Sequence, residues 1–88
     1  MNVVFKASFA RDLRRVRDKH LRDSIQEVIE HTEQAHTLQE VADVKRLKGG
    51  TGYYRVRIDD YRLGLLVEGD TVTFVRFLHR KDIYRYFP

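Results

Sequence analysis

The sequence contains no cysteine and no long apolar stretch in its 88 residues. Without cysteine no disulfide can stabilise the chain, which fits a reducing compartment and leaves stability to a packed core. A transmembrane helix needs about 20 consecutive apolar residues, and a signal peptide needs an apolar run behind a basic start. Because the sequence has neither pattern, we expect a cytoplasmic protein without a membrane partner.

Internal repeats, low-complexity tracts and linkers are also absent, so we expect a single domain over residues 1–88 with one core. Lysine and arginine number 17 against 13 acidic residues, and the formal net charge is +4. Such an excess favours an anionic partner, which can be nucleic acid, the ribosome or an acidic protein. The histidines lack the grouping typical of a metal site, and we expect neither a metal nor a cofactor.

Residues 53–66 alternate charged and apolar side chains around a two-aspartate turn. Successive side chains of a strand point to opposite faces of the sheet, which places Arg55 and Arg57 on one face. After the turn, Arg62 stands between two apolar neighbours. This pattern predicts a β-hairpin with one apolar face and one face that carries three guanidinium groups.

The remaining periodicity predicts an α+β fold, in which an N-terminal strand and a helix hairpin pack on one face of an antiparallel sheet. Ser8 is the expected N-cap of the first helix, and Asp12 is expected on its solvent side with the arginines. The other sheet face should stay open and carry the arginines of the hairpin. The expected elements are a strand at 2–6, two helices ending near 17 and 35, strands at about 53–58, 61–67 and 71–78, and a helical turn in the C-terminal tail.

Two further local expectations concern the capping of a short helix and the core. Thr37 and Glu40 have the spacing of a capping box, which predicts one turn of helix behind them. The core is expected to contain the inward residues of the last two strands together with apolar residues of the earlier elements, namely Val3, Phe5, Phe9, Leu13, Val16, Ile25, Val28, Ile29, Val56 and Ile58.

Five short motifs, taken in order, resemble the RelE/ParE superfamily of bacterial toxins, and the last of them resembles the RelE branch in particular. They span nearly the whole chain at suitable spacings. The motifs are Ala7-Ser8-Phe9-Ala10-Arg11-Asp12-Leu13, Leu47-Lys48-Gly49, Tyr54-Arg55-Val56-Arg57-Ile58, Asp60-Tyr61-Arg62-Leu63 and His79-Arg80-Lys81-Asp82-Ile83-Tyr84-Arg85.

The resemblance implies a RelE-like fold and a toxin encoded beside a cognate antitoxin, which holds the toxin inactive. It also implies an enzyme, because toxins of the RelE type enter the ribosomal A site and cut the mRNA codon there without a metal. In that reaction the ribose 2′-oxygen attacks the next phosphate and leaves a 2′,3′-cyclic phosphate and a 5′-hydroxyl. The expected partners are therefore A-site mRNA, ribosomal RNA and the antitoxin protein.

Four residues are expected to carry the catalysis and to lie together on the sheet face and its rim. Arg62 matches the family's catalytic arginine, and guanidinium donors suit the phosphate of the transition state. Tyr84 matches the terminal tyrosine, which can stack on a base or orient the 2′-OH. Arg80 is the candidate that acts on the leaving 5′-oxygen, as a charge stabiliser or a proton donor. His79 is the favoured general base, because imidazole titrates near neutrality.

Four further cations are expected to bind RNA, and they are Lys45, Lys48, Arg55 and Arg57. The last two match positions that often hold lysine in RelE, and arginine is a poor base because it keeps its proton. The sequence leaves the base open among His79, Arg55 and Arg57.

Other interpretations also stay open at this point. The arginines are compatible with an ordinary solvated sheet face, His79 with a strand-end residue, and Tyr84 with a core or antitoxin contact. Two alternative functions share the fold. One is a ParE-like inhibitor of DNA gyrase, which needs neither His79 nor Tyr84, and the other is a non-catalytic partner in an antitoxin–repressor complex.

Overall fold

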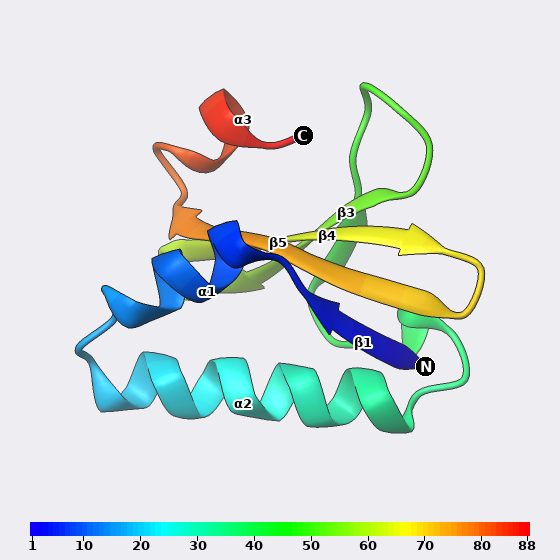
Figure 1. The fold of residues 1–88 in the computed structure, drawn as a ribbon, viewed down its shortest axis with the longest axis horizontal. Coiled ribbons are helices and arrows are strands. Elements are labelled where there is room, and N and C mark those ends of the chain that lie inside the picture. Colours follow the sequence, from blue (N-terminus) through cyan, green and yellow to red (C-terminus); the bar gives the residue numbers. More distant parts are fainter.

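A computed structural model describes residues 1–88 as an α+β fold around one sheet, which confirms the predicted class (Figure 1). Helices lie on one side of the sheet, and the C-terminal turn lies on the other. The elements in chain order are β1 (Asn2–Phe5), α1 (Ala7–Arg14), α2 (Lys19–Gln34), the 3-10 turn η1 (Leu38–Glu40), β2 (Val44–Arg46), β3 (Tyr53–Ile58), β4 (Tyr61–Glu68), β5 (Thr71–His79) and α3 (Ile83–Tyr86).

The five strands form one sheet in the order β1-β5-β4-β3-β2. The three strands predicted as antiparallel, β3, β4 and β5, pair in that way, and β2 adds a fourth antiparallel strand beside β3. The N-terminal strand is the exception, because β1 runs parallel to β5 at the edge of the sheet. The sequence did not predict β2, since a strand of three residues is too short to show an alternating pattern.

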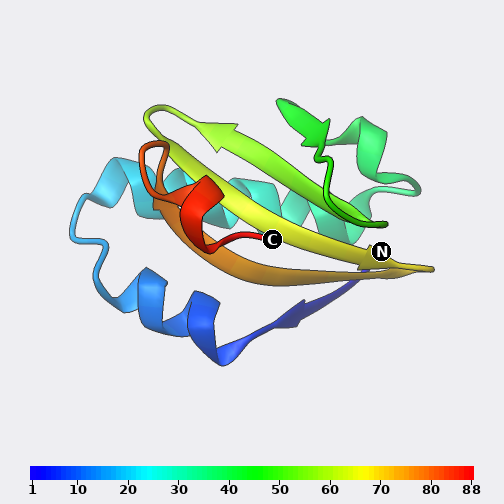
Figure 2. The same cartoon turned by 90° about the horizontal axis from the view of Figure 1, so that it is seen from above.

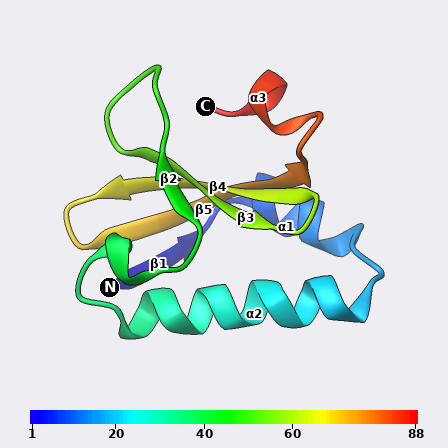
Figure 3. The ribbon, with the colours of Figure 1, turned by 180° about the vertical axis from the view of Figure 1, so that it is seen from behind.

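The helical layer covers one face of the sheet. α2 runs along the length of the sheet in Figure 1, and Figure 3 shows the same layer from behind. None of the helices combines the length and the apolar composition that crossing a membrane requires. The buried core between helices and sheet consists of Phe9, Val16, Leu21, Ile25, Leu38, Val41, Val56, Ile58, Leu63, Leu65, Val72, Phe74 and Phe77.

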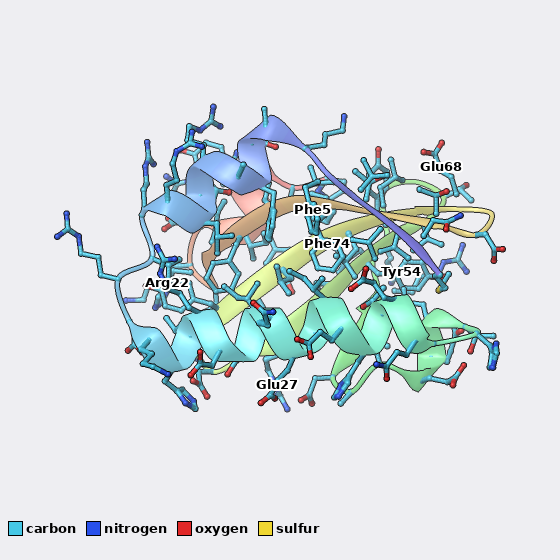
Figure 4. All side chains as sticks on the ribbon, turned by 60° about the horizontal axis from the view of Figure 1, so that its bottom comes forward. Phe5, Arg22, Glu27, Tyr54, Glu68 and Phe74 are labelled. Atoms are coloured by element: carbon cyan, nitrogen blue, oxygen red, sulfur yellow. The ribbon has the colours of Figure 1, made fainter.

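Phe5 lies at the border of this core, and the prediction that it is buried is wrong. Its exposed fraction is 50%, although its ring stacks on Phe9 with 5.7 Å between centroids. Figure 4 shows Phe5 beside Phe74, with which it makes a tilted contact at 5.5 Å. The ring stays half exposed because β1 is an edge strand, beyond which no other strand packs.

Helix α1 closes the part of β5 that the short β1 leaves unpaired. The Ser8 hydroxyl donates to the carbonyl oxygen of Val75 at 2.6 Å, and the backbone N–H of Phe77 donates to the Asp12 carboxylate at 3.0 Å. These contacts correct two predictions. Ser8 is not the N-cap, since the helix begins one residue before it, and Asp12 does not face solvent, since it is only 3% exposed.

The start of α2 is fixed by two hydrogen bonds across the joint with α1. The Asp18 carboxylate accepts from the backbone N–H of Leu21 at 3.2 Å and caps the helix. Arg22 Nε donates to the carbonyl oxygen of Val16 at 2.6 Å, and Figure 4 shows Arg22 at this joint. The joint predicted between the two helices is therefore a short and well-bonded connection.

The predicted capping box is confirmed behind α2. The Thr37 side chain caps η1, while the Glu40 carboxylate accepts from the backbone N–H groups of Thr37 and His36, both at 2.8 Å. Because these donors favour the charged carboxylate, first Thr37 and then His36, the pKa of Glu40 lies below its ordinary value of 4.5. This capped turn leads the chain from the helical layer to β2.

The C-terminal tail lies on the sheet face opposite α2, as Figure 2 shows from above. The helical turn predicted there is confirmed as α3. The face that we expected to be open is nevertheless covered near its centre. Phe87 is only 2% exposed, and its ring lies against the backbone of Gly64 in β4.

Candidate nucleic-acid interface

The arginines of the hairpin lie on the sheet face opposite the helices, as predicted. Their neighbours along β3, Val56 and Ile58, are buried in the core, so the alternating side chains point the other way. The strand register then aligns further cations with them: Lys45 of β2 pairs with Arg55, and Arg57 pairs with Arg62. We call the set on this face the cationic face, and its members are Lys45, Arg55, Arg57, Arg62 and Arg76.

Arg57 and Arg62 are direct cross-strand neighbours on this face. Like charges in this arrangement repel and weaken a sheet. The Arg62 guanidinium donates from Nη1 only to the backbone oxygens of Asp59 and Tyr61, both at 2.9 Å. Arg57 has a carboxylate partner, Asp43, at 3.4 Å. Only Arg57 therefore has a carboxylate partner, and an anion between the two guanidinium groups would relieve the remaining repulsion.

Asp43 orients the first two arginines of the cationic face. It has a positive φ of 62°, a conformation that aspartate adopts more readily than most residues. Its carbonyl oxygen accepts from Arg55 Nη1 at 2.6 Å and from the backbone N–H of Arg57 at 3.2 Å. The turn before β2 therefore fixes where both guanidinium groups lie.

Arg80 lies at the same end of the sheet as Arg62. Its backbone N–H donates to the carbonyl oxygen of Asp60 at 2.7 Å, and its Nε is 3.8 Å from the Asp60 carboxylate. Arg62 donates to the backbone of the same β3–β4 turn through Asp59. Two of the four expected catalytic residues thus contact the same turn, Arg62 through backbone oxygens and Arg80 through the exposed Asp60 carboxylate.

His79 lies on the other side of the sheet, which contradicts the expectation that it joins Arg62 and Tyr84. The register pairs His79 with Tyr61, and their rings meet edge to face with 5.4 Å between centroids. Tyr61 in turn stacks on the buried Phe77. His79 lines a pocket of about 350 Å³ against the α1–α2 joint, and its Nδ1 accepts from the backbone N–H of Lys81 at 3.1 Å.

Tyr84 and Lys48 occupy separate exposed positions. Tyr84 is 58% exposed on α3, directly after the buried Ile83. Lys48 is exposed in the loop between β2 and β3, at the end of the sheet away from Arg62. No hydrogen bond or ion pair joins either residue to the arginines of the cationic face. Any ligand that touches all of these side chains must therefore extend across the face.

Arg76 belongs to the cationic face and was missed in the sequence. The register aligns it with Gly64 and Arg55, while its guanidinium bonds the buried Asp12 at 2.7 Å. It also lies 5.6 Å from the centre of the Tyr86 ring. Alternation along residues 71–78 was the available signal, because Arg76 is the only charged residue among apolar and threonine neighbours there.

Comparison with known proteins gives a family for this geometry. The family model described as the ParE toxin of type II toxin–antitoxin systems matches residues 3–84. The curated Toxin RelE3 of Methanocaldococcus jannaschii is 44% identical over 89 residues, and the match covers 100% of both chains.

Solved structures show the same fold. A RelB–RelE antitoxin–toxin complex from Methanococcus jannaschii contains a chain that is 42% identical, with a TM-score of 0.83 over 97% of this chain and 99% of that one. A RelE–RelB complex from Pyrococcus horikoshii OT3 contains a chain with a TM-score of 0.74 over 93% and 97%, at 21% identity, which is a likeness of fold alone. The chain therefore belongs to the RelE/ParE superfamily, the toxins of type II toxin–antitoxin systems.

Proposed function

We propose that this toxin is a ribosome-dependent mRNA endonuclease that cuts A-site codons with the cationic face. The observation that carries the proposal is the Arg57–Arg62 cross-strand pair, which a sheet tolerates poorly unless an anion joins it. A phosphodiester is such an anion, and guanidinium groups match its oxygens with paired N–H donors. The 44% identity to a toxin named RelE favours the RelE-type activity over the other activities of the superfamily.

The proposed reaction is attack of the ribose 2′-oxygen on the adjacent phosphorus. As the new P–O2′ bond forms, the 2′-OH gives its proton to water, the P–O5′ bond breaks, and the leaving 5′-oxygen takes a proton from water, so that one fragment ends in a 2′,3′-cyclic phosphate and the other begins with a 5′-hydroxyl. Arg62, helped by Arg57, stabilises the doubly charged phosphorane, which is commonly the largest contribution to such catalysis. Arg80, at the same turn, stabilises the leaving 5′-oxygen, and the exposed Tyr84 ring stacks on a base of the codon.

The placement of His79 changes its proposed part in this reaction. Its ring contacts Tyr61 on the helical side of the sheet, while the phosphate would lie on the cationic face. We therefore do not assign the general-base step to His79, and the rate is proposed to rest on charge stabilisation by arginines. Substitution of His79 tests this assignment directly.

Binding of RNA is proposed to replace weak internal ion pairs of the free protein. The Arg57–Asp43 pair has side-chain exposed fractions of 56% and 53%, and the Arg80–Asp60 pair has 58% and 70%. Exposed pairs contribute about 0–1 kcal/mol each, so phosphates can take these cations at little cost. Lys45 and Lys48 are proposed to extend the contact along the mRNA or ribosomal RNA backbone.

A cognate antitoxin is the proposed protein partner. Two of the similar structures are complexes between RelE and RelB proteins. An acidic segment of the antitoxin, laid across the cationic face, would neutralise the same groups that we assign to RNA. The antitoxin and the mRNA would then compete for the cationic face. We expect a rising concentration of antitoxin to protect ribosome-bound mRNA from cleavage to a rising degree.

A cleavage assay on programmed ribosomes tests the proposed function. Purified toxin without antitoxin is added to ribosomes that hold a defined codon in the A site, and primer extension maps the ends. We expect cuts within that codon, none in the same mRNA without ribosomes, and a cyclic phosphate on the upstream fragment. Intact A-site codons after incubation with folded toxin would reject the proposal.

The gyrase-inhibitor alternative is kept because the matching family model is that of ParE toxins. It predicts that supercoiling by purified gyrase stalls while ribosome-bound mRNA stays whole. The endonuclease proposal predicts the reverse pattern. Both assays can use one toxin preparation, so a single batch of folded protein separates the two activities.

A further inference from the structure

Gly64 interrupts a row of cations on the cationic face. The strand register aligns Lys45, Arg55, Gly64 and Arg76 across β2, β3, β4 and β5. The lysine and the two arginines carry long charged side chains, whereas Gly64 between them carries no side chain. Glycine inside a strand weakens it and often marks a close approach by another group. Gly64 does not have the positive φ that would require glycine. It borders a register shift between β4 and β5, and another group also approaches its Cα closely.

The group that approaches is the ring of Phe87. A Cβ atom placed on Gly64 would lie 2.8 Å from both Cγ and Cδ2 of Phe87 and 2.9 Å from Cδ1. The ring is 2% exposed and meets Tyr53 edge to face with 5.6 Å between centroids. Phe87 does not belong to the main core. It fills a separate socket whose floor is the bare backbone of Gly64.

This socket determines the orientation of α3. Ile83 and Phe87 lie four residues apart, are 0% and 2% exposed, and are joined by a backbone hydrogen bond of 2.8 Å. Their burial turns Tyr84 and Tyr86 outward, at 58% and 55% exposed. The Arg76 guanidinium over the Tyr86 ring adds a second attachment of the tail.

We propose that Gly64 is a positioning residue that seats Phe87 and thereby places Tyr84 beside the cationic face. This inference rests on the proposed RNA cleavage, in which Tyr84 stacks on a codon base. Any side chain at position 64 would displace the ring from its socket, and α3 would move with it. Tyr84 would then be present but out of reach of the base that it is meant to hold.

The test combines a steric clash with its relief. Gly64→Ala adds the clashing methyl group, Phe87→Leu replaces the ring with a smaller aliphatic side chain, and the double variant combines the two changes so that the methyl group has room. A displacement of about 1 Å can cost on the order of 100-fold in rate, so we expect Gly64→Ala to lose about that much in kcat on programmed ribosomes. The double variant should recover most of the loss, which a general weakening of the sheet would not allow.

A second readout reports on the tail without reference to activity. Trypsin cleaves after Arg85, and we expect this cut to be slow while the burial of Ile83 and Phe87 holds the backbone of the tail in place; mass spectrometry follows the cut. We expect faster cleavage in Gly64→Ala and native protection in the double variant. Val56→Ala, which removes buried atoms from the opposite face of β3, serves as the control for lost stability and should keep the tail protected at temperatures where the fold is intact.

The two readouts separate the possible failures. Native tail protection in Gly64→Ala, or a loosened tail with unchanged kcat, overturns the positioning role. Loss of activity without recovery in the double variant also overturns it. If wild-type toxin leaves A-site mRNA whole, the proposed function is rejected along with the role of Tyr84, while the protease readout still shows whether Gly64 seats α3.

Discussion

Asp12 and Arg76 form an ion pair that joins α1 to β5 across 64 positions of the sequence. Arg76 Nε donates to the Asp12 carboxylate at 2.7 Å and Nη2 at 3.2 Å, while the backbone N–H of Phe77 donates to the same group. The Asp12 side chain is 1% exposed and that of Arg76 18%. The pair closes the unpaired edge of β5 and ties Arg76, a member of the cationic face, to α1.

Asp12→Ala should lower the free energy of unfolding by about 3 kcal/mol, because it leaves a mostly buried guanidinium and a backbone N–H without a partner. Urea unfolding followed by circular dichroism measures the change. Arg11→Ala, an exposed substitution on the same helix, should change the free energy by less than about 0.5 kcal/mol. Equal unfolding midpoints for the two variants would show that the pair is dispensable.

Substitutions of Phe9 and Phe5 test where the hydrophobic core ends, because one ring is buried and the other is half exposed. Phe9 is 2% exposed and Phe5 50%, although their rings stack on each other. Phe9→Ala should destabilise the fold by about 3–5 kcal/mol, and Phe5→Ala by clearly less, because half of its surface stays in water when folded. Urea midpoints of both variants decide this, and a loss in Phe5→Ala as large as in Phe9→Ala would contradict the partial burial.

Much of the fold was predictable because alternation and helical spacing are local signals. The alternation of Arg55 and Arg57 with Val56 predicted the two sheet faces, and the spacing of Thr37 and Glu40 predicted the capping box. Burial of Asp12 was not predictable, since its partner lies in a strand far along the chain. Half-exposure of Phe5 follows from the edge position of β1, which the composition of that strand does not reveal.

The sequence predicted most of the cations that belong to the candidate site, but it did not predict how the other site residues are arranged around them. Arg62 contacts Asp59 and Arg80 contacts Asp60 of the same turn, a consequence of hairpin register. His79 lies on the opposite face because the strand register pairs it with the core-facing Tyr61. A shift of the register by one residue would move it to the other face of the sheet. Likewise, Phe87 covers the cationic face only because Gly64 leaves room for it, a steric relation between two distant positions.

The capping box gives a pH dependence with a definite sign. The folded pKa of Glu40 is lowered from 4.5, so its stabilising effect is present above that value and is lost as the pH falls through the lower folded pKa. The Glu40→Gln variant should unfold at lower urea concentration than wild type at about pH 7, and the difference should shrink toward about pH 3. Glu27→Gln, at an exposed position of α2, is the control and should track wild type. A difference that stays constant over this range would contradict the charged cap.

His79→Gln tests whether the histidine takes part in the chemistry. General-base catalysis contributes about 100- to 10,000-fold, whereas we expect less than about a tenfold loss, since the ring lies on the helical side of the sheet. Single-turnover cleavage on programmed ribosomes, measured across the pH range in which imidazole titrates, provides the readout. A large loss of cleavage rate in His79→Gln, together with the disappearance of the pH dependence of that rate, would show that His79 is the general base.

The central claim is that the cationic face, rather than positive charge in general, breaks the phosphodiester. Its most direct measurement compares Arg62→Ala with Arg46→Ala in single-turnover cleavage of a defined A-site codon. Arg46 belongs to the same sheet but pairs with the core-facing Tyr54, so it lies on the other face. We predict a loss of about 100- to 1,000-fold for Arg62→Ala with an unfolding midpoint at or above that of wild type, because the substitution removes the repulsion with Arg57, and near-normal cleavage for Arg46→Ala. Equal rates for the two variants, or full activity in Arg62→Ala, would contradict the account.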